Sequence, residues 1–531
     1  MDFRKVDVVV IGGGGAGARA ALEAGMTGLE VMLMVKGPFP GSGSTSAAFA
    51  EITQFAAATD SNDDALTHAK DTIQFGGGLC KEELVQILAQ EAPARLRELK
   101  SFGVEFAEQG EMDLGFAQTK KRGHLLRNRH AIAIVEAIKK QLESMDNVYV
   151  QQQCMAVELI HCDDRIAGVV ALDTHSDSLF VVGAKAIVLA TGGAHDLFPL
   201  GPSTVGMTGD GYAMCLKAGL PLINMGVFQV GPTVVLPRAG ILAAPFWRLQ
   251  PSLINGKGEE FLPKYLPRGI TVEDVMATAQ FPYDSQSPAG YLHRSIYGEV
   301  QEFGCWELNP IYADLTHVSV ERIVEEIPFT YRHLLALGID LHQEPVPLTL
   351  ACQCFHGGVE IDSAGATAIQ GLFAAGEVSG GLRGYRRPAG NCLAEGQVFG
   401  RIAGGSAAEY AKVTKHLHID KSTCLQQHND FAGQFQGSIE PRTTKAEIQK
   451  EMFRNVLLEP DRSSIDEALK MLEEREQAMY DMKATSRKEL YEIRNLMSVG
   501  KQVLYSMKQL VASWTSVHDE GSLRHDSSPQ H

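Results

Sequence analysis

The stretch Val6-Asp-Val-Val-Val-Ile-Gly-Gly-Gly-Gly-Ala-Gly17 places a short apolar run directly before a glycine-rich turn. A helical pattern follows over residues 18–24, and a second β-like run occupies residues 29–35. In such a unit the first glycine of Gly12-x-Gly14-x-x-Gly17 makes the tight turn, the second lets a pyrophosphate approach the backbone, and the third packs helix against strand. The helix N-terminus then presents its partial positive charge to the phosphates. This segment therefore predicts a dinucleotide-binding fold.

One feature that usually accompanies this unit is missing. An acidic residue about 20 positions after the turn normally binds the adenosine ribose. Here the second strand ends in Val35-Lys36. Another group must therefore take the ribose, or the geometry of the adenosine end differs.

Two later segments extend the nucleotide fold. Residues 185–194 form an apolar strand that breaks at Thr191-Gly-Gly, and residues 371–380 form another that runs into a glycine turn carrying Glu377. A helix with small residues follows from Asn391 to about Ala408. Segments so far apart predict one nucleotide fold interrupted by insertions, which suits a long ligand such as FAD better than NAD. The helix near Asn391 could direct its positive end at the flavin N1/C2=O edge.

Composition narrows the class of protein. The chain has 531 residues, enough for two to four domains, and 44% of them are hydrophobic. The formal net charge of −16 disfavours a nucleic-acid partner, because phosphate binding relies on clustered Lys and Arg. The chain has neither an apolar signal region at its start nor a run of 18 apolar residues. We therefore expect a cytoplasmic protein without a membrane span.

The nine cysteines are scattered, and none forms a C-x-x-C pair. The sequence therefore indicates no metal site and no iron–sulfur cluster, and any iron–sulfur partner must be a separate chain. Strand alternation puts the thiols of Cys352 and Cys354 on one face, where we interpret them as buried or half-buried free thiols.

Several short motifs, in order along the chain, give it a family resemblance. It resembles the flavoprotein subunits of succinate dehydrogenase and fumarate reductase, and L-aspartate oxidase, over residues 5 to about 410. The absent ribose acid is also similar to that family. The matching pieces are the Gly12–Gly17 loop, Gly43-Ser-Thr-Ser-Ala-Ala48, Gly76-Gly-Gly-Leu79, Ala190-Thr-Gly-Gly193, Met207-Thr-Gly-Asp-Gly211, Gln229 with Pro232-Thr233, Gly357-Gly358, Gly376-Glu377 and Gly400-Arg401.

The resemblance implies an α/β architecture with three parts. A split Rossmann-like FAD-binding domain would comprise residues 1–237 and 346–412, and an α+β capping domain residues 238–345. A C-terminal helical domain would occupy residues 413–531. The sequence itself supports helices in this last part, because Ser464-x-x-Glu467 is typical of a capping box at a helix start.

The resemblance also implies how FAD is held. Many fumarate reductases join the flavin covalently to a histidine, and the matching position here is Ser44, which cannot form that bond. We therefore expect non-covalent FAD, with Ser44 and Thr45 as hydrogen-bond donors. The expected cofactor-binding residues are Gly12, Gly14, Gly15, Ala16, Gly17, Lys36, Gly43, Ser44, Thr45, Ala190, Thr191, Gly192, Asp210, Glu377, Asn391 and Leu393.

Arginines are the catalytic residues that the resemblance implies. A proton-donating arginine in the cap maps onto Arg294, and Arg248 follows the altered pair ahead of it at the expected spacing. A second arginine, which grips a substrate carboxylate, maps onto Arg387. Its planar guanidinium matches a carboxylate bidentately. The expected partner is therefore a small-molecule carboxylate.

Three departures count against fumarate or succinate itself as the substrate. Gly231 replaces a family histidine, Ala244-Pro245 replaces a Thr-Glu pair, and Gln353 replaces a second histidine. A site without these partners should reject a small dicarboxylate, because buried polar groups would be left unpaired. The same regions contain side chains that fit a larger, more apolar or more anionic substrate, namely Phe246, Trp247, Arg383 and Arg386. His356 is a possible acid in place of the lost histidines.

Three functional hypotheses remain open at this stage. The first is a dehydrogenase or reductase that moves a hydride between flavin N5 and a C–C bond beside a carboxylate. The second is an oxidase of a C–N bond, as in L-aspartate oxidase. The third is a flavoprotein electron-transfer subunit with a degenerate substrate site.

Overall fold

The computed structural model describes residues 3–108, 114–162, 164–201, 203–235, 240–279, 287–303, 311–483 and 486–522. A seven-stranded sheet forms the centre of the cofactor-binding part, in the order β5-β2-β1-β8-β7-β6, with β16 also paired to β8. Its strands are β1 (Phe3–Ile11), β2 (Val31–Met34), β5 (Val148–Gln151), β6 (Cys154–Cys162), β7 (Arg165–Asp173), β8 (Ser178–Leu189) and β16 (Leu372–Ala374).

Strand β8 joins the distant pieces of this sheet. It runs parallel to β1 and, at Ile187–Leu189, parallel to β16, while its first half pairs antiparallel with β7. The apolar runs that the sequence marks as strands are thus neighbours, and Val8, Val9 and Val10 of β1 are fully buried. Three chain segments far apart in sequence therefore end at one edge of the sheet, which confirms the prediction of an interrupted α/β nucleotide fold.

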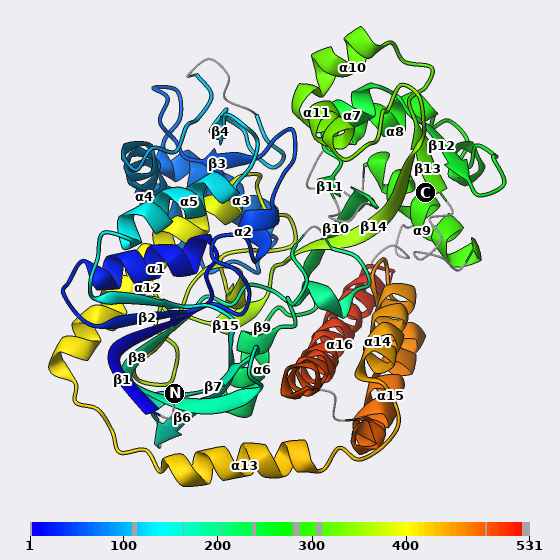
Figure 1. Ribbon diagram of the computed structural model, residues 1–531. Coiled ribbons are helices and arrows are strands. Elements are labelled where there is room, and N and C mark those ends of the chain that lie inside the picture. The colour runs from blue at the N-terminus through cyan, green and yellow to red at the C-terminus, as the bar shows by residue number, and fades with distance from the viewer. Residues whose placement is uncertain are drawn as a thin grey trace, which may run out of the picture.

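Helices α1 (Gly15–Gly25) and α12 (Asn391–Val413) pack against each other on the same side of this sheet (Figure 1). Both helices begin at the edge where β1, β8 and β16 end. The other helices of this part are α2 (Ser44–Ala47), α3 (Ala65–Gly76), α4 (Glu82–Ser101), α5 (Ile132–Leu142) and α6 (Asp210–Lys217); its small strands are β3 (Gln54–Ala56), β4 (Gly123–Leu125), β9 (Leu222–Ile223), β15 (Gly358–Glu360) and β17 (Ser379–Gly380).

A second sheet leads out of the cofactor-binding part into a separate lobe, which we call the cap (Figure 1). It is antiparallel, in the order β11-β10-β14-β13-β12, and its longest strand, β14, returns from the cap to the cofactor-binding part. Its strands are β10 (Phe228–Val234), β11 (Gly240–Ile241), β12 (Ser252–Asn255), β13 (Ile311–Asp314) and β14 (Val346–Phe355); the cap helices are α7 (Ala244–Arg248), α8 (Val272–Thr278), α9 (Ala289–Phe303), α10 (Val320–Glu326) and α11 (Pro328–Ala336).

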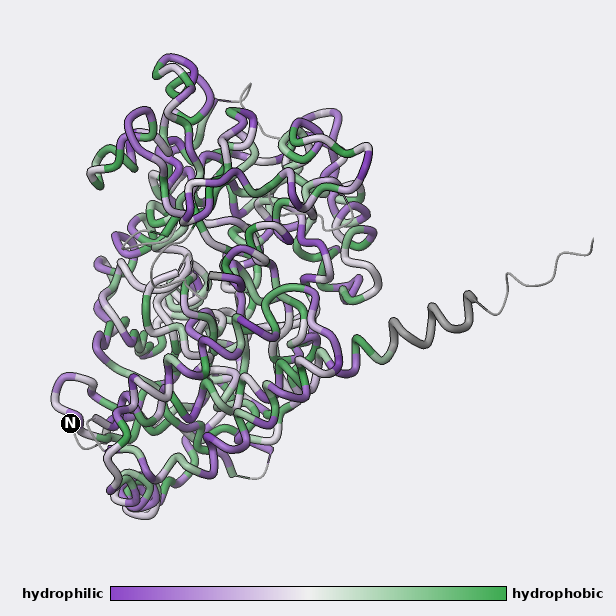
Figure 2. The backbone as a smooth tube through the Cα atoms, turned by 90° about the vertical axis from the view of Figure 1, so that its right-hand side faces the viewer, coloured by the Kyte–Doolittle hydropathy of each residue, from purple (hydrophilic) through white to green (hydrophobic). Residues whose placement is uncertain are grey.

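The C-terminal part is helical, as the sequence predicts. It comprises α13 (Lys421–Gly433), α14 (Pro441–Val456), α15 (Arg462–Gln477) and α16 (Arg487–Ser522). The capping box of α15 is formed by Asp461 and Ser464, so the helix begins three residues earlier than the predicted Ser464 cap. Hydrophobic and hydrophilic stretches are interspersed along the backbone (Figure 2), and no helix among the described residues is long and apolar enough to cross a membrane.

Candidate active site

A cavity of about 520 Å³ lies where the strands of the large sheet end and α1 and α12 begin. A volume in this range is typical of cofactor and ligand sites. The structure thus brings together most of the residues that the sequence singled out. Those that line the cavity are Gly12, Gly14, Gly15, Ala16, Lys36, Gly43, Ser44, Thr45, Ala190, Thr191, Gly192, Asp210, Glu377, Arg387 and Leu393.

The glycine turn before α1 has the close contacts that its spacing requires. Gly12 has a φ of +112°, and a Cβ on Gly17 would lie 1.8 Å from the Gly12 carbonyl oxygen. Gly17 is therefore a packing residue and does not line the cavity. The backbone N–H of Gly15 donates to Thr45 Oγ1 over 3.2 Å, which ties α2 to the first turn of α1.

Lys36, at the position where a ribose acid usually stands, lies between two carboxylates. Its Nζ is 3.0 Å from Asp210 Oδ2 and 2.8 Å from Glu492 Oε1. Burial opposes the charge, but Asp210 and Glu492 outweigh it and raise the pKa of Lys36. The lysine therefore connects β2 to α6 and to the C-terminal helix α16, and both Lys36 and Asp210 border the cavity as a charged pair.

His195 is a cavity residue that the sequence reasoning missed. Its Nε2 lies 3.0 Å from Glu377 Oε1 and 3.4 Å from Ser44 Oγ. Burial disfavours the imidazolium, but the Glu377 charge and hydrogen bond outweigh burial and raise the pKa of His195. His195 in turn helps to hold the pKa of Glu377 at about 2, against the effect of burial. The signal was its position two residues after the Thr191-Gly-Gly turn.

Arg387 is buried at the cavity wall beside two glutamines. Its Nη2 donates to Gln229 Oε1 over 3.1 Å, and Gln229 Nε2 donates to Gln353 Oε1 over 3.3 Å. Within the described part of the chain, Arg387 Nε and Gln353 Nε2 are buried donors without a hydrogen-bond partner. Because a buried unpaired donor costs roughly 1–3 kcal/mol, these atoms indicate a site for an acceptor.

A second buried guanidinium, that of Arg383, is occupied within the protein. It pairs with Glu395 of α12, with Nε 2.8 Å from Oε2, and its Nη1 donates to the Phe355 carbonyl over 2.9 Å. Arg383 therefore contributes positive charge to the cavity, while its hydrogen bonds fix the start of α12 to the end of β14.

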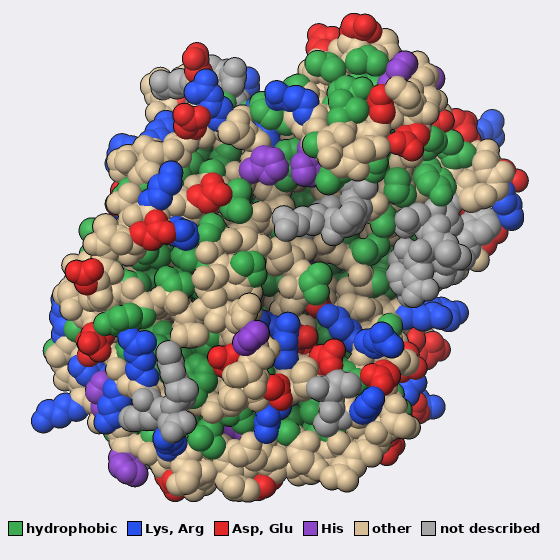
Figure 3. Space-filling view, in the orientation of Figure 1, with side chains coloured by type: hydrophobic (Ala, Val, Ile, Leu, Met, Phe, Trp, Pro, Cys, Tyr) green, Lys and Arg blue, Asp and Glu red, His purple; other side chains and the backbone are tan. Residues whose placement is uncertain are grey.

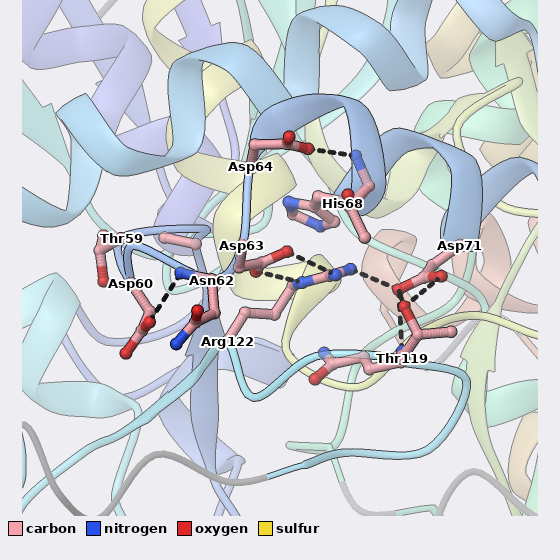
Figure 4. Close-up of polar contacts among 12 residues, drawn as sticks. Thr59, Asp60, Asn62, Asp63, Asp64, His68, Asp71, Thr119 and Arg122 are labelled. Atoms are coloured by element: carbon pink, nitrogen blue, oxygen red, sulfur yellow. Dashed lines mark hydrogen bonds and ion pairs between the residues drawn. The ribbon is translucent and has the colours of Figure 1, made fainter.

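Asn391 begins α12 as expected, but its side chain is directed away from the cavity. Its Oδ1 lies 2.9 Å from His68 Nε2, and its Nδ2 donates to Thr72 Oγ1 over 3.0 Å, both in α3. Figure 4 shows the polar cluster around His68, in which the Arg122 guanidinium lies between Asp63 and Asp71. The Asn391 side chain thus anchors the start of α12 to α3, and the direction of the helix N-terminus toward the flavin stays a prediction.

Neither cap arginine reaches the cavity. Arg294 pairs with Glu459 of the C-terminal part, with Nη2 2.6 Å from Oε1, and its side chain is 38% exposed. Arg248 pairs with Glu326 over 2.9 Å and is 55% exposed. Glu326 belongs to the cap and Glu459 to the C-terminal part. In this structure neither arginine therefore lies at the cavity, and their catalytic role stays a prediction.

Other residues discussed for the substrate site also lie elsewhere. Phe246 and Trp247 are buried in the cap's own core, where Trp247 Nε1 donates to the Leu242 carbonyl over 3.2 Å, so they do not line the cavity. His356 Nδ1 donates to the Gly384 carbonyl over 2.6 Å. Burial and nearby arginines lower its pKa to about 3, so it is neutral and unsuited as a replacement acid.

The residues present fit FAD. The cavity extends from the glycine turn at α1 to the N-terminal turn of α12, so two helix N-termini border one continuous space. Thr191 Oγ1 and Gln397 Oε1 are buried at its wall without a partner among the described residues. FAD, with a pyrophosphate in its middle and a polar ring at each end, would supply these missing hydrogen bonds.

The fold and this cavity define an FAD-binding oxidoreductase. A family model described as "FAD binding domain" matches residues 7–393. The chain is 34% identical to one subunit of the fumarate reductase (CoM/CoB) of Methanothermobacter marburgensis, over 88% of this chain and 84% of that protein. It is 30% identical to an L-aspartate oxidase of Yersinia pestis, over 77% of each chain. The chain therefore belongs to the FAD-dependent family of fumarate reductase and succinate dehydrogenase flavoproteins and L-aspartate oxidase.

A solved structure agrees with this assignment. Sdh1 of Mycobacterium smegmatis, in complex with UQ1, superposes with a TM-score of 0.82 at 27% identity, covering 96% of this chain and 88% of that one. The three-part arrangement of cofactor sheet, cap and C-terminal helices is thus shared along nearly the whole chain, and the predicted fold class is confirmed.

Proposed function

We propose that the protein moves a hydride between FAD and a C–C bond beside a substrate carboxylate, and that the substrate is not fumarate itself. The observation that supports this most directly is the buried, partly unpaired guanidinium of Arg387 at the cavity wall. A guanidinium in this state binds a carboxylate through charge-assisted hydrogen bonds.

The chain's own residues would orient and hold the reactants. The turn at Gly12–Ala16 and the start of α12 would hold FAD, which supplies the two-electron chemistry when bound. Arg387 Nε and Gln353 Nε2 would bind the substrate carboxylate, and Gln229 keeps Arg387 in position through its Oε1. His195 would hold a proton at Nε2 beside Glu377. Its imidazole would therefore be the group at this wall of the cavity that can give or take a proton.

The replacement of family histidines favours a different substrate. Gln353 lies where the family has a histidine, and its amide binds an acceptor without carrying charge. Gly231 pairs with Ala351 inside the sheet and does not line the cavity. The site thus offers fewer cationic groups for a second carboxylate, which favours a substrate with one carboxylate near the flavin.

A spectral assay tests this function. FAD-loaded protein would be mixed anaerobically with a set of saturated carboxylates to detect flavin bleaching, and reduced protein with enoates to detect reoxidation. A matched set of carboxamides, which have no charge for Arg387 to bind, should react at least tenfold more slowly. Bleaching by amino acids with release of ammonia would instead assign C–N oxidation, and no response to any carboxylate would overturn the proposal.

We further propose that the protein exchanges electrons with a separate partner chain and that it acts in the cytoplasm. The Methanothermobacter relative is named as one subunit of its fumarate reductase, which supports an assembly of several chains. On the face shown in Figure 3, acidic and basic side chains are mixed, which fits contact with protein better than with nucleic acid. Co-purification from native extract, followed by iron analysis of the complex, tests the predicted iron–sulfur partner.

Ser44 supports the non-covalent attachment of FAD. Its hydroxyl contacts His195 Nε2 and borders the cavity, and serine offers no nitrogen for a flavin bond. Acid precipitation of the protein should therefore release all flavin into the supernatant, whereas a coloured pellet would contradict this.

A further inference from the structure

Two thiols meet at the wall of the cofactor cavity. Cys354 lies at the end of β14, and Cys392 is the second residue of α12. Their Sγ atoms are 3.7 Å apart, and both residues line the cavity. Neither the family resemblance nor the hydride chemistry proposed above uses them.

This separation is van der Waals contact between two sulfurs. A disulfide bond is about 2.05 Å long, so each sulfur needs to move by less than about 1 Å to form one. The backbones that carry the thiols are held at this spacing by Arg383, which binds the Phe355 carbonyl next to Cys354 and the Glu395 carboxylate one turn after Cys392. The two thiols are therefore positioned for bond formation without rearrangement of the fold.

The electrostatic surroundings divide the pair into a thiolate and a thiol. The hydrogen bond from Cys354 and the charges of Arg387 and Arg383 lower the pKa of Cys392 to about 6, although burial opposes this. The same hydrogen bond, together with burial, raises the pKa of Cys354. A thiolate is the nucleophile in thiol–disulfide chemistry, so Cys392 is the reactive member.

Other buried cysteines of the chain behave differently. Burial alone raises the pKa of Cys215 to about 12, and burial with the Asp173 charge does the same for Cys154. Cys352, two residues before Cys354 on the same strand, is fully buried, does not line the cavity, and also has a raised pKa, from burial and the Glu377 charge. The Cys354–Cys392 pair is thus set apart by its contact, its position and its two arginine neighbours.

We propose that Cys354 and Cys392 form a redox-active dithiol that exchanges two electrons with the FAD bound in the same cavity. On oxidation an S–S bond forms between them and the S–H bond of Cys354 breaks. Two electrons and the proton of Cys354 pass to oxidised FAD, which becomes its two-electron-reduced anion. The reverse step reduces the disulfide, so atoms and charges balance without a further reactant.

A dithiol beside the flavin gives the site a second two-electron redox group, which can be reduced or oxidised whichever carboxylate is bound. Arg383 and Arg387 stabilise the thiolate form, and the positive N-terminal turn of α12 adds to that effect.

The first test counts electrons in the full-length, FAD-loaded protein. Protein oxidised with excess FAD and oxygen, then freed of unbound FAD, would be titrated anaerobically with dithionite while flavin absorbance is recorded. Wild-type protein should consume twice as much dithionite per FAD as Cys354→Ser or Cys392→Ser. Cys352→Ala, which keeps both paired sulfurs, should match the wild type. Equal consumption by all four proteins would overturn the proposal.

The second test needs no variant. Oxidised and reduced wild-type protein would each be alkylated, digested and examined by mass spectrometry. A peptide linking residues 354 and 392 should appear in the oxidised sample and be lost on reduction; two alkylated thiols in both samples would overturn the proposal. Because neither test involves a carboxylate, failure of the dithiol is distinguishable from failure of the proposed substrate class.

Discussion

Glu51 of the cofactor-binding part caps a helix of the cap at Thr330. Its Oε2 accepts from the Thr330 backbone N–H and from Thr330 Oγ1, both over 2.9 Å, at the first turn of α11. Glu51 is 8% exposed, so a buried carboxylate complements the positive end of that helix. Beside it, the centroid of the Phe49 ring lies 4.5 Å from that of His130 and 4.4 Å from that of His333 in α11. These contacts hold the cap against the cavity.

Replacing Glu51 by alanine should loosen the cap. Loss of two hydrogen bonds to a charged group costs about 2 kcal/mol, because Thr330 N–H and Oγ1 would lose their acceptor. Amides at the start of α11 should therefore exchange with deuterium about thirtyfold faster, because about 1.36 kcal/mol is tenfold in an equilibrium constant, and the KM for substrate should rise. Glu344→Ala, an exposed carboxylate on the same lobe, is the control. Equal α11 exchange in the two variants would show that Glu51 does not anchor the cap.

Arg387 and Arg294 should respond very differently to replacement by methionine. Arg387→Met removes a buried guanidinium from the cavity, and we expect substrate-driven flavin reduction to slow about 100-fold, as loss of a bidentate charged contact implies. Arg294→Met breaks a pair that is 38% exposed on one side and 50% on the other, worth less than about 1 kcal/mol. Rapid-mixing absorbance measurements compare the two variants, and a larger loss of rate with Arg294→Met would assign the catalytic role to Arg294 instead.

The parts of the site built from local motifs could be predicted from sequence. The glycine turn fixes its own geometry, so Gly12 to Ala16 line the cavity as their spacing indicates. The strand before Glu377 likewise follows from its apolar run and glycine turn. Here each residue's position depends on neighbours a few residues away, which sequence patterns report directly.

Contacts between distant segments could not be predicted in this way. The contacts between the cap and the C-terminal part include the pair of Arg294 with Glu459, which are 165 residues apart. His195 depends on Glu377, 182 residues away, and Cys354 on Cys392 at the start of a different element. No spacing rule connects such pairs. The direction of the Asn391 side chain could not be predicted either, because it is set by hydrogen bonds to α3.

Lys36→Met should destabilise the folded protein. Asp210 and Glu492, 12% and 11% exposed, would each lose their ammonium partner, at a combined cost of about 3 kcal/mol in the free energy of unfolding. Urea unfolding of the FAD-loaded protein measures this cost. Lys217→Met, which removes an ammonium that is 49% exposed, is the control, and the urea midpoint of this variant should barely differ from that of the wild type. If adding Asp210→Asn and Glu492→Gln to Lys36→Met recovers no stability, the buried charges are not the cause.

His195 should make stability depend on pH. Glu377 raises the pKa of His195 in the folded protein. The contribution of His195 to the free energy of unfolding is therefore complete below its unfolded pKa of about 6.5, and it is lost as pH rises through the folded pKa. The folded pKa of Glu377 is lowered to about 2, so its contribution is present above about 4.5 and is lost as pH falls toward 2. The pair therefore stabilises the protein most between about pH 4.5 and 6.5.

The variant His195→Gln isolates the alkaline side of this dependence. Glutamine donates a hydrogen bond to Glu377 at every pH but carries no proton that titrates. The difference in free energy of unfolding between wild type and variant should therefore be largest near pH 6 and shrink as pH rises to 9. Urea unfolding at closely spaced pH values measures it. A difference that stays constant over this range would mean that His195 is neutral in the folded protein and that Glu377 does not hold its proton.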